Sequence, residues 1–288
     1  MKFTLIAIIS IFLISCSQEN KSCGDFDLNQ TYEQIKLPVA LKEISGITFL
    51  SKNKIACVQD EKGIVFIYDI HKDKLKQSID FAGDKDYEAI ANVNDTIYVL
   101  RSNGDIYEID NLESSEVSSI THHTFLSKVN NSEGMCFDSK HYRLLIACKG
   151  KPEKGSAKKY QKVVYSFDLS TKTMSEEPVL VIDPTSIIEM ADQSASNSFF
   201  GESKNVDQFD PAEIAIDPKT GNYFVLSAVG KRLAVFSENG MLLCSANLNP
   251  EIYKQPEGLA FNSEGDLVIS DEGKNSKGNL VVLKRISN

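Results

Sequence analysis

The chain has 288 residues, a net charge of −9 and 42% hydrophobic residues. This acidic balance, with no basic stripe to neutralise phosphates, argues against a nucleic-acid partner. After the first fifteen residues no segment approaches the eighteen consecutive apolar residues of a membrane-spanning helix, so we expect one water-soluble body.

The N-terminal segment has the order of an export signal. Lys2 precedes an apolar run over residues 3–14, which is too short for a comfortable membrane anchor. The run ends in Leu13-Ile14-Ser15-Cys16, which resembles the bacterial lipobox and predicts lipid attachment at Cys16. An ordinary signal peptide cleaved nearby is the alternative.

The lipobox interpretation divides the chain into three parts. We expect a signal peptide over residues 1–15, a lipidated polar tether over 16–30 and the folded domain over 31–288. The lipid on Cys16 would hold the protein to a bacterial membrane, with the outer membrane favoured. The domain would then lie in the cell envelope, facing the periplasm or the outside.

Five cysteines remain once Cys16 is set aside, and an odd number cannot all pair within one chain. Four of them stand inside apolar runs and are predicted to be buried as small hydrophobic residues: Cys57, Cys136, Cys148 and Cys244. The fifth is Cys23. A disulfide between Cys136 and Cys148 on adjacent strands stays open. The chain has only four histidines and no Cys-x-x-Cys, so a zinc site has little support.

A pattern of strand, turn and strand recurs along the chain, and four of its five copies open with a glutamate at one register. The openings are Ile44–Ile47, Tyr87–Ile90, Ser132–Met135, Ala212–Ala215 and Pro256–Leu259. A second and a third strand with alternating large apolar residues follow each opening. The pattern predicts meanders of antiparallel β-strands.

An outer, fourth strand follows in four copies, near Leu75–Ile79, Val117–Thr121, Pro178–Ile182 and Met241–Ala246. The fifth copy runs out of chain, and Tyr32–Leu37 can supply its outer strand by pairing the two ends of the chain. Radial repetition of four-stranded sheets with such a closure predicts an all-β propeller, because it protects the sheet edges.

The spacing of the openings sets the number of blades. Most intervals are 43 to 45 residues, but 80 residues separate the third opening from the fourth. That interval holds no further opening and contains two polar insertions, 151–159 and 183–210. We therefore predict five blades, with six as the alternative. In the second insertion, Phe199-Phe200 either touches a ligand or packs on a propeller face.

These motifs as a set resemble the SdiA-regulated family of bacterial envelope proteins, distant relatives of NHL-repeat propellers. The resemblance covers nearly all of residues 40–286. It rests on Ser45-Gly46-Ile47 with Val58-Gln59-Asp60-Glu61, Tyr87-Glu88-Ala89-Ile90 with Leu100-Arg101-Ser102-Asn103-Gly104, Glu133-Gly134 with Ala147-Cys148-Lys149-Gly150, and Pro256-Glu257-Gly258-Leu259 with Ser270-Asp271-Glu272-Gly273. The resemblance implies a five-bladed propeller with a calcium site. More distant six-bladed relatives include metal-dependent hydrolases, but likeness of fold does not transfer activity.

Inner strands line the channel of a propeller, so one register of successive blades converges on the axis. Four glutamates would form most of a ring there, with Ser45 in the fifth place: Glu88, Glu133, Glu213 and Glu257. Side chains after the second strands would line the same face: Gln59, Asp60, Arg101, Lys149, Ser227, Asp271 and Glu272. The glycines after the axial position are explained by crowding at the axis.

Buried carboxylates that share a channel must take up protons, pair with cations or bind a metal. An all-oxygen donor set favours calcium. The alternative is that the glutamates accept backbone hydrogen bonds from the neighbouring blade, with Arg101 and Lys149 pairing the rest. Both arrangements can hold together.

We therefore expect a calcium-binding envelope module, without catalytic activity, that presents its loop face to a small ligand or an envelope protein. The alternative is a metal-dependent hydrolase of the lactonase or phosphotriesterase kind, with Asp60 or Asp271 as the base.

Overall fold

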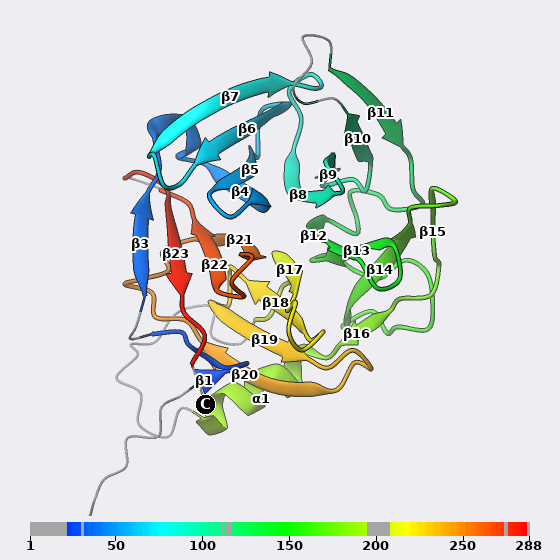
Figure 1. Cartoon of the computed structure of the whole chain (residues 1–288). Helices are drawn as coiled ribbons and strands as arrows, with labels where there is room; N and C mark the ends of the chain where they lie inside the picture. The colour runs from blue at the N-terminus through cyan, green and yellow to red at the C-terminus, as the bar shows by residue number, and fades with distance from the viewer. Residues whose placement is uncertain are drawn as a thin grey trace, which may run out of the picture.

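A computed structural model describes residues 22–29, 32–110, 112, 117–194, 208–273 and 276–286. Five small antiparallel sheets stand in a ring around a central axis (Figure 1). The predicted five-bladed propeller is confirmed, and the six-bladed alternative is wrong. The predictions for the signal peptide, Cys16 and Phe199-Phe200 lie outside the described residues.

Each blade begins with an inner strand and builds outward. Blade 1 contains β4 (Ile44–Ser51), β5 (Lys54–Gln59), β6 (Ile64–Asp69) and β7 (Lys74–Asp80). Blade 2 contains β8 (Tyr87–Val93), β9 (Thr96–Arg101), β10 (Ile106–Asp110) and β11 (Ser118–His122). Blade 3 contains β12 (Ser132–Asp138), β13 (Arg143–Cys148), β14 (Lys162–Asp168) and a split outer edge of β15 (Thr173–Met174) and β16 (Leu180–Ile182).

The last two blades follow the same plan. Blade 4 contains β17 (Glu213–Ile216), β18 (Tyr223–Ser227), β19 (Arg232–Phe236) and β20 (Leu242–Asn247). Blade 5 contains β21 (Pro256–Phe261), β22 (Leu267–Asp271), β23 (Asn279–Leu283) and, from the other end of the chain, β3 (Glu33–Lys36). A short 3₁₀ helix over Val39–Leu41 connects β3 to blade 1.

The two ends of the chain close the ring, as the sequence predicts. Strand β3 pairs antiparallel with β23, with Ile35 opposite Leu280. The pairing covers the edge of β23, which would otherwise expose unpaired backbone groups.

The hydrophobic core consists of five apolar layers, each between two neighbouring blades. The layer between blades 1 and 2, for example, contains Val65 and Ile67 from one sheet and Ile97 and Val99 from the other. Both faces of a blade are therefore buried, which explains why the middle strands read as nearly continuous apolar runs.

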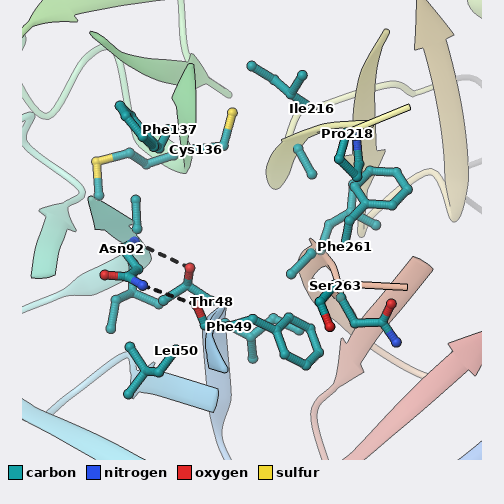
Figure 2. A pocket seen from close by; sticks show the side chains of 18 of the residues that line it. Thr48, Phe49, Leu50, Asn92, Cys136, Phe137, Ile216, Pro218, Phe261 and Ser263 are labelled. Carbon is teal, nitrogen blue, oxygen red and sulfur yellow. Dashed lines mark hydrogen bonds between the residues drawn. The ribbon is translucent and has the colours of Figure 1, made fainter. Parts of the chain in front are cut away.

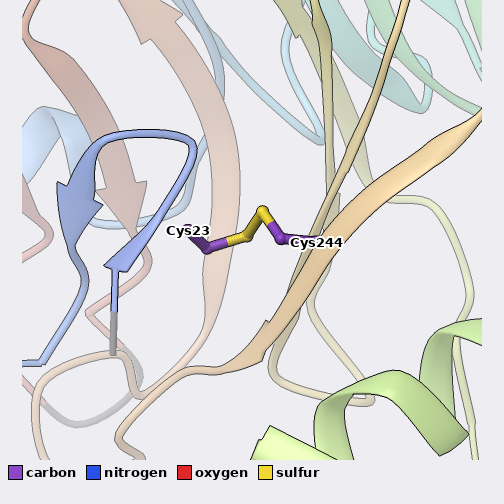
Figure 3. The surroundings of a disulfide bond; sticks show 2 residues. All are labelled: Cys23 and Cys244. Atoms are coloured by element: carbon purple, nitrogen blue, oxygen red, sulfur yellow. A yellow bond between two sulfur atoms is a disulfide. The ribbon is translucent and has the colours of Figure 1, made fainter. Parts of the chain in front are cut away.

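The segment over residues 22–29, expected within the tether, belongs instead to the folded body. Strands β1 (Ser22–Cys23) and β2 (Phe26–Asp27) form a small hairpin. Cys23 forms a disulfide with Cys244 of β20, with 5.7 Å between their Cα atoms (Figure 3). The side chains of Phe26 and Leu28 are fully buried against blades 4 and 5. The folded domain therefore begins before residue 31.

The disulfide corrects the prediction that Cys244 is a free, buried residue. Cys57, Cys136 and Cys148 are free, as favoured. Cys148 lies opposite Ser132 and Cys136 lies opposite Leu145, so Cys136 and Cys148 do not pair.

The second insertion begins with a helix that the sequence analysis did not predict. Helix α1 (Pro184–Ser194) lies beside β20 (Figure 1). Two residues of this helix, Ile187 and Ala191, are buried on its inner face. Within the described ranges, no helix is long and apolar enough to span a bilayer.

Candidate functional site: the acidic mouth of the channel

A break in the β-ladder coincides with the repeated glutamate. In blade 2, Tyr87 pairs with Arg101 and Ala89 pairs with Leu100, so Glu88 between them has no cross-strand partner. The same shift occurs at Glu133 and Glu257. Such a bulge re-aims the extra side chain out of the regular alternation. In these three blades the motif therefore coincides with a bulge that places a carboxyl at the axis, whereas Glu213 in blade 4 pairs with Leu226 without a break in the ladder.

The glycine after the axial residue is explained by the close approach of neighbouring inner strands. A Cβ on Gly46 would lie 2.7 Å from the Cα of Ala89, and one on Gly134 would lie 2.7 Å from the Cα of Glu213. These neighbouring atoms belong to the backbone, which cannot move aside as the end of a flexible side chain can. The packing explanation is confirmed at both positions.

The four glutamates experience one another's charge. Burial, followed by the charge of Glu133 and then by Asp86, raises the pKa of Glu88 to about 9. Burial and then Glu133 raise the pKa of Glu257 to about 7. Burial raises the pKa of Glu213 well above its usual range, and the charges of Glu88 and Glu133 add to the effect. We call these four glutamates and Ser45 the acidic mouth.

Glu213 is a structural brace within this mouth. Its side chain is 1% exposed. Its Oε1 accepts hydrogen bonds from the backbone N–H of Met135 at 2.7 Å and of Ile214 at 3.0 Å. Because Met135 belongs to blade 3, this carboxyl joins two blades, as the hydrogen-bonding alternative predicts for some of the glutamates.

Glu133 is held by two donors. Its Oε1 accepts from Asn131 Nδ2 at 2.6 Å and from Lys149 Nζ at 3.3 Å. Burial acts to lower the pKa of Lys149, but the charges of Glu133, Glu257 and Glu88 raise it above its usual value. Among the described residues, Lys149 is the cation that forms an ion pair with an axial glutamate.

Arg101, the other predicted cation, turns away from the glutamates. Its Nη1 lies 3.3 Å from Asp105 Oδ2 in the same hairpin. The expected pairing of Arg101 with the axial carboxyls is therefore wrong. Asp105 is the nearer partner, because it follows four residues later across a tight turn.

Two of the predicted lining residues form hydrogen bonds to neighbouring loops and do not face the channel as free donors or acceptors. Asp271 is 1% exposed and accepts from the backbone N–H of Gln255 at 2.7 Å and from Asn279 Nδ2 at 3.2 Å. Ser227 is fully buried, and its hydroxyl accepts from the N–H of Asp210 at 3.0 Å. Both side chains fix loop geometry.

The remaining predicted residues lie around the mouth at different depths. Ser45 is buried, and its carbonyl accepts from the hydroxyl of Ser270 at 3.0 Å. Gln59 is half-buried and donates to the carbonyl of Ala40 at 3.4 Å. Asp60 is exposed, and the side chain of Glu272 accepts from Gln255.

A second polar position, which was not predicted from the sequence, lies two residues before the axial one. It holds Glu43, Asp86, Asn131 and Gln255 in four of the blades. Asp86 raises the pKa of Glu88, Asn131 donates to Glu133, and a hydrogen bond from Gln255 lowers the otherwise raised pKa of Glu257. Extending the repeat alignment by two residues towards the N-terminus would have revealed this position.

The donor atoms of the mouth are carboxylate and amide oxygens, which suit a hard cation. Across the part of the chain that the structure describes, no group of three His, Cys, Asp or Glu stands ready-made around a metal position. Glu213 already accepts hydrogen bonds from backbone amides, and Glu133 already pairs with Lys149. Glu88, Glu257 and Asp86 are therefore the carboxyls best able to turn towards a cation.

Solved structures of several propeller proteins are similar to this chain. A glutaminyl cyclase of Myxococcus xanthus superposes with a TM-score of 0.54 at 8% identity, over 89% of this chain and 97% of that one. A luciferin-regenerating enzyme gives 0.50 at 12% identity, over 88% and 95%. A gluconolactonase of Xanthomonas campestris gives 0.51 at 9%, over 84% and 72%. At these identities the likeness concerns the fold alone.

No curated protein sequence matches the chain. The profile of the SdiA-regulated family matches residues 26–275, which include all five inner strands and the acidic mouth. This match agrees with the resemblance carried by the repeated motifs. The chain therefore belongs to the SdiA-regulated family.

Proposed function

We propose that this protein is a non-catalytic, cation-binding propeller of the bacterial envelope, whose acidic mouth holds calcium and presents it to a small ligand or a partner protein. One observation carries the proposal. Bulges in three inner strands, in blades 2, 3 and 5, bring carboxyl groups from remote parts of the chain to one end of the channel.

The electrostatics of the mouth support a cation. At neutral pH the raised pKa values leave Glu88 largely protonated and Glu257 partly so, because burial and like charges disfavour their ionised forms. A bound divalent cation would replace those protons. Glu88, Glu257 and Asp86 would hold it, with the amide oxygens of Asn131 and Gln255 as neutral donors.

The envelope location has independent support. A disulfide forms and persists in oxidising compartments, and Cys23–Cys244 fits the periplasm or the cell surface. The same location follows from the export signal and from the proposed lipid on Cys16, which would attach the protein to a membrane. Both lines favour an exported protein, and the lipobox-like motif at Cys16 alone supports the lipid anchor.

The hydrolase alternative receives less support from the site. A hydrolase needs a base positioned near a substrate or a metal-bound water. Asp271 is nearly inaccessible and accepts hydrogen bonds from Gln255 and Asn279. The likeness to a gluconolactonase structure, at 9% identity, concerns only the fold.

Calorimetric titration with calcium tests the proposal. We expect chelator-stripped protein that retains Cys23 to bind one calcium, and Glu257→Gln to weaken binding by at least about tenfold because a charged ligand is lost. Glu251→Gln is the matched control, since Glu251 is exposed on a loop close before Glu257. Absence of heat, together with an unchanged melting temperature on adding calcium, would reject the cation site.

A further inference from the structure

The opposite end of the channel holds a cavity of about 420 Å³. All five inner strands contribute to its wall, from the halves that lie farthest from the axial glutamates. Figure 2 looks into this cavity, with the labelled side chains arranged around an open centre. The volume lies within the range of small-molecule sites.

The wall of this cavity is largely apolar and repeats between blades. Phe49, Phe137 and Phe261 each stand four residues after the axial position, and all three are half-buried. Ile216 is half-buried in blade 4, and Pro218 is exposed at the rim. Apolar surface left open to water in a concave site gains free energy when an apolar molecule covers it.

Three polar side chains of the wall are already paired within the protein. Asn92 Nδ2 donates to the carbonyl of Phe49 at 3.2 Å. Asn262 Nδ2 donates to Asp266 Oδ2 at 3.0 Å, and Asn262 Oδ1 accepts from the backbone N–H of Glu264. The ammonium of Lys52 pairs with Glu264. None of these three side chains therefore demands a charged or strongly polar partner from an occupant.

The floor of the cavity separates it from the acidic mouth. Met135 lines the cavity, and its N–H donates to Glu213 Oε1 on the other side. Cys136 lines the cavity next to Met135, and burial followed by the charge of Glu213 raises the pKa of its thiol. The braced carboxyl of the acidic mouth thus lies directly behind the wall of this cavity, and the two ends of the channel are chemically distinct.

We propose that this cavity is a second binding site, which takes an uncharged, apolar small molecule independently of any cation at the acidic mouth. Its concave shape and closed floor suit a compact molecule better than a protein segment. The site is distinct from the proposed calcium site in residues and chemistry, so either proposal can fail while the other stands.

A fluorescence titration with N-phenyl-1-naphthylamine, an uncharged aromatic probe, tests this site. We expect saturable binding of one probe per chain, unchanged by calcium or by Glu257→Gln. Ile216→Glu places a charge in the wall and should weaken probe binding by at least about tenfold. Leu243→Glu is the matched control, because Leu243 is an exposed apolar residue of the same blade on the outer strand β20.

Cys136 provides a second readout at the cavity wall. Of the free cysteines in the described part of the chain, Cys57 and Cys148 are fully buried, whereas Cys136 is half-buried. Alkylation of Cys136 by N-ethylmaleimide should be slow, because burial raises the pKa of its thiol, and we expect saturating probe to slow it further. Alkylation should in turn abolish probe binding in the wild type, whereas Cys136→Ser treated in the same way should keep it.

Two outcomes would overturn the proposal. One is the absence of saturable binding to the folded wild type, and the other is undiminished binding to a folded Ile216→Glu variant. Near-ultraviolet circular dichroism checks the fold of each variant. If Ile216→Glu does not fold, Ser263→Glu at the exposed rim takes its place, with the same loss expected and the same reversal if binding persists.

Discussion

Equivalent glutamates in the repeat perform different tasks, because their neighbours differ. Glu213 joins two blades through backbone amides, whereas Glu133 is balanced by Lys149. Glu88 is instead buried near Glu133 and Asp86, and burial and then these two charges disfavour its ionisation. The position in the repeat brings each carboxyl to the axis, and its burial and charged neighbours set its pKa.

The raised pKa of Glu88 predicts how stability depends on pH in calcium-free buffer. Its pKa is about 9 in the folded protein and near 4.5 when unperturbed. Between these values the folded state holds a proton that the unfolded state has lost, so the free energy of unfolding falls as pH rises. Glu88→Gln removes this titration, and we expect a shallower fall between pH 5 and 9.

Urea denaturation at several pH values measures this effect. Glu251→Gln, an exposed control, should keep the wild-type slope. Identical slopes for Glu88→Gln and the wild type would mean that Glu88 keeps an ordinary pKa in the folded protein.

The axial residues could be predicted from the repeat register, because a local motif encodes each bulge. The roles of the individual glutamates could not be predicted from the repeat. The brace at Glu213 depends on Met135, 78 residues earlier in the chain. The contact exists only once blades 3 and 4 are side by side. In contrast, Arg101 and Asp105 lie within one hairpin, so their pairing could have been predicted from the sequence.

Among the elements, the N-terminal hairpin β1–β2 makes more contacts than its length suggests. The ring of Phe26 meets Phe224 edge-on at 5.9 Å between centroids, and the guanidinium of Arg285 lies 4.8 Å from the Phe26 centroid. Arg285 Nη2 also lies 2.6 Å from Asp217 Oδ1. The hairpin therefore fastens blade 4 to blade 5.

The disulfide should contribute strongly to the stability that this hairpin gives to blades 4 and 5. Replacing both Cys23 and Cys244 with serine should lower the free energy of unfolding by about 2 to 5 kcal/mol, because the bridge restricts the unfolded chain over 221 residues. Reductant should bring the wild type down to the level of the double variant and leave the variant unchanged. Denaturation curves with and without dithiothreitol measure both effects. Insensitivity of the wild type would show that the bridge adds no stability.

The sequence could not reveal this element. Its strands have two residues each, which is too short for hydrophobic alternation to show. Cys23 lies in a polar stretch that resembles a tether. Its partner Cys244 lies in an apolar run typical of a buried thiol, so nothing local connects the two.

At the scale of the whole molecule, ion pairs link neighbouring blades in addition to the apolar layers. Examples are Lys172 Nζ to Glu108 Oε2 at 2.7 Å between blades 3 and 2, and Lys140 Nζ to Glu238 Oε1 at 2.5 Å between blades 3 and 4. The exposed pair adds little free energy individually. The apolar layers dominate, and they require a closed ring.

Closure by β3 can be tested directly. Ile35→Pro should disrupt the ladder opposite Leu280 and lower the free energy of unfolding by on the order of 2 kcal/mol, because proline removes a backbone donor. The exposed edge of β23 should then promote self-association, which light scattering after size exclusion detects. Ile35→Val keeps the ladder, so its free energy of unfolding and its oligomeric state should match those of the wild type. A monomeric, equally stable proline variant would show that the closing strand is dispensable.

The blade count could be predicted from the spacing of the openings, since each blade is one repeat. The long third interval was correctly assigned to insertions, although helix α1 within it was not foreseen. Polar composition there concealed the apolar face formed by Ile187 and Ala191, which the neighbouring sheets bury.

The bond between Cys23 and Cys244 also has a topological consequence. It turns the chain between these two residues into a covalent circle that contains blades 1 to 4 and strand β3 of blade 5. A protease that cuts this circle once would produce no separate fragments, because the two pieces stay joined at the bridge. The protein would thus remain one molecule after a single nick in the circle, and would come apart there only when the nick and chemical reduction coincide.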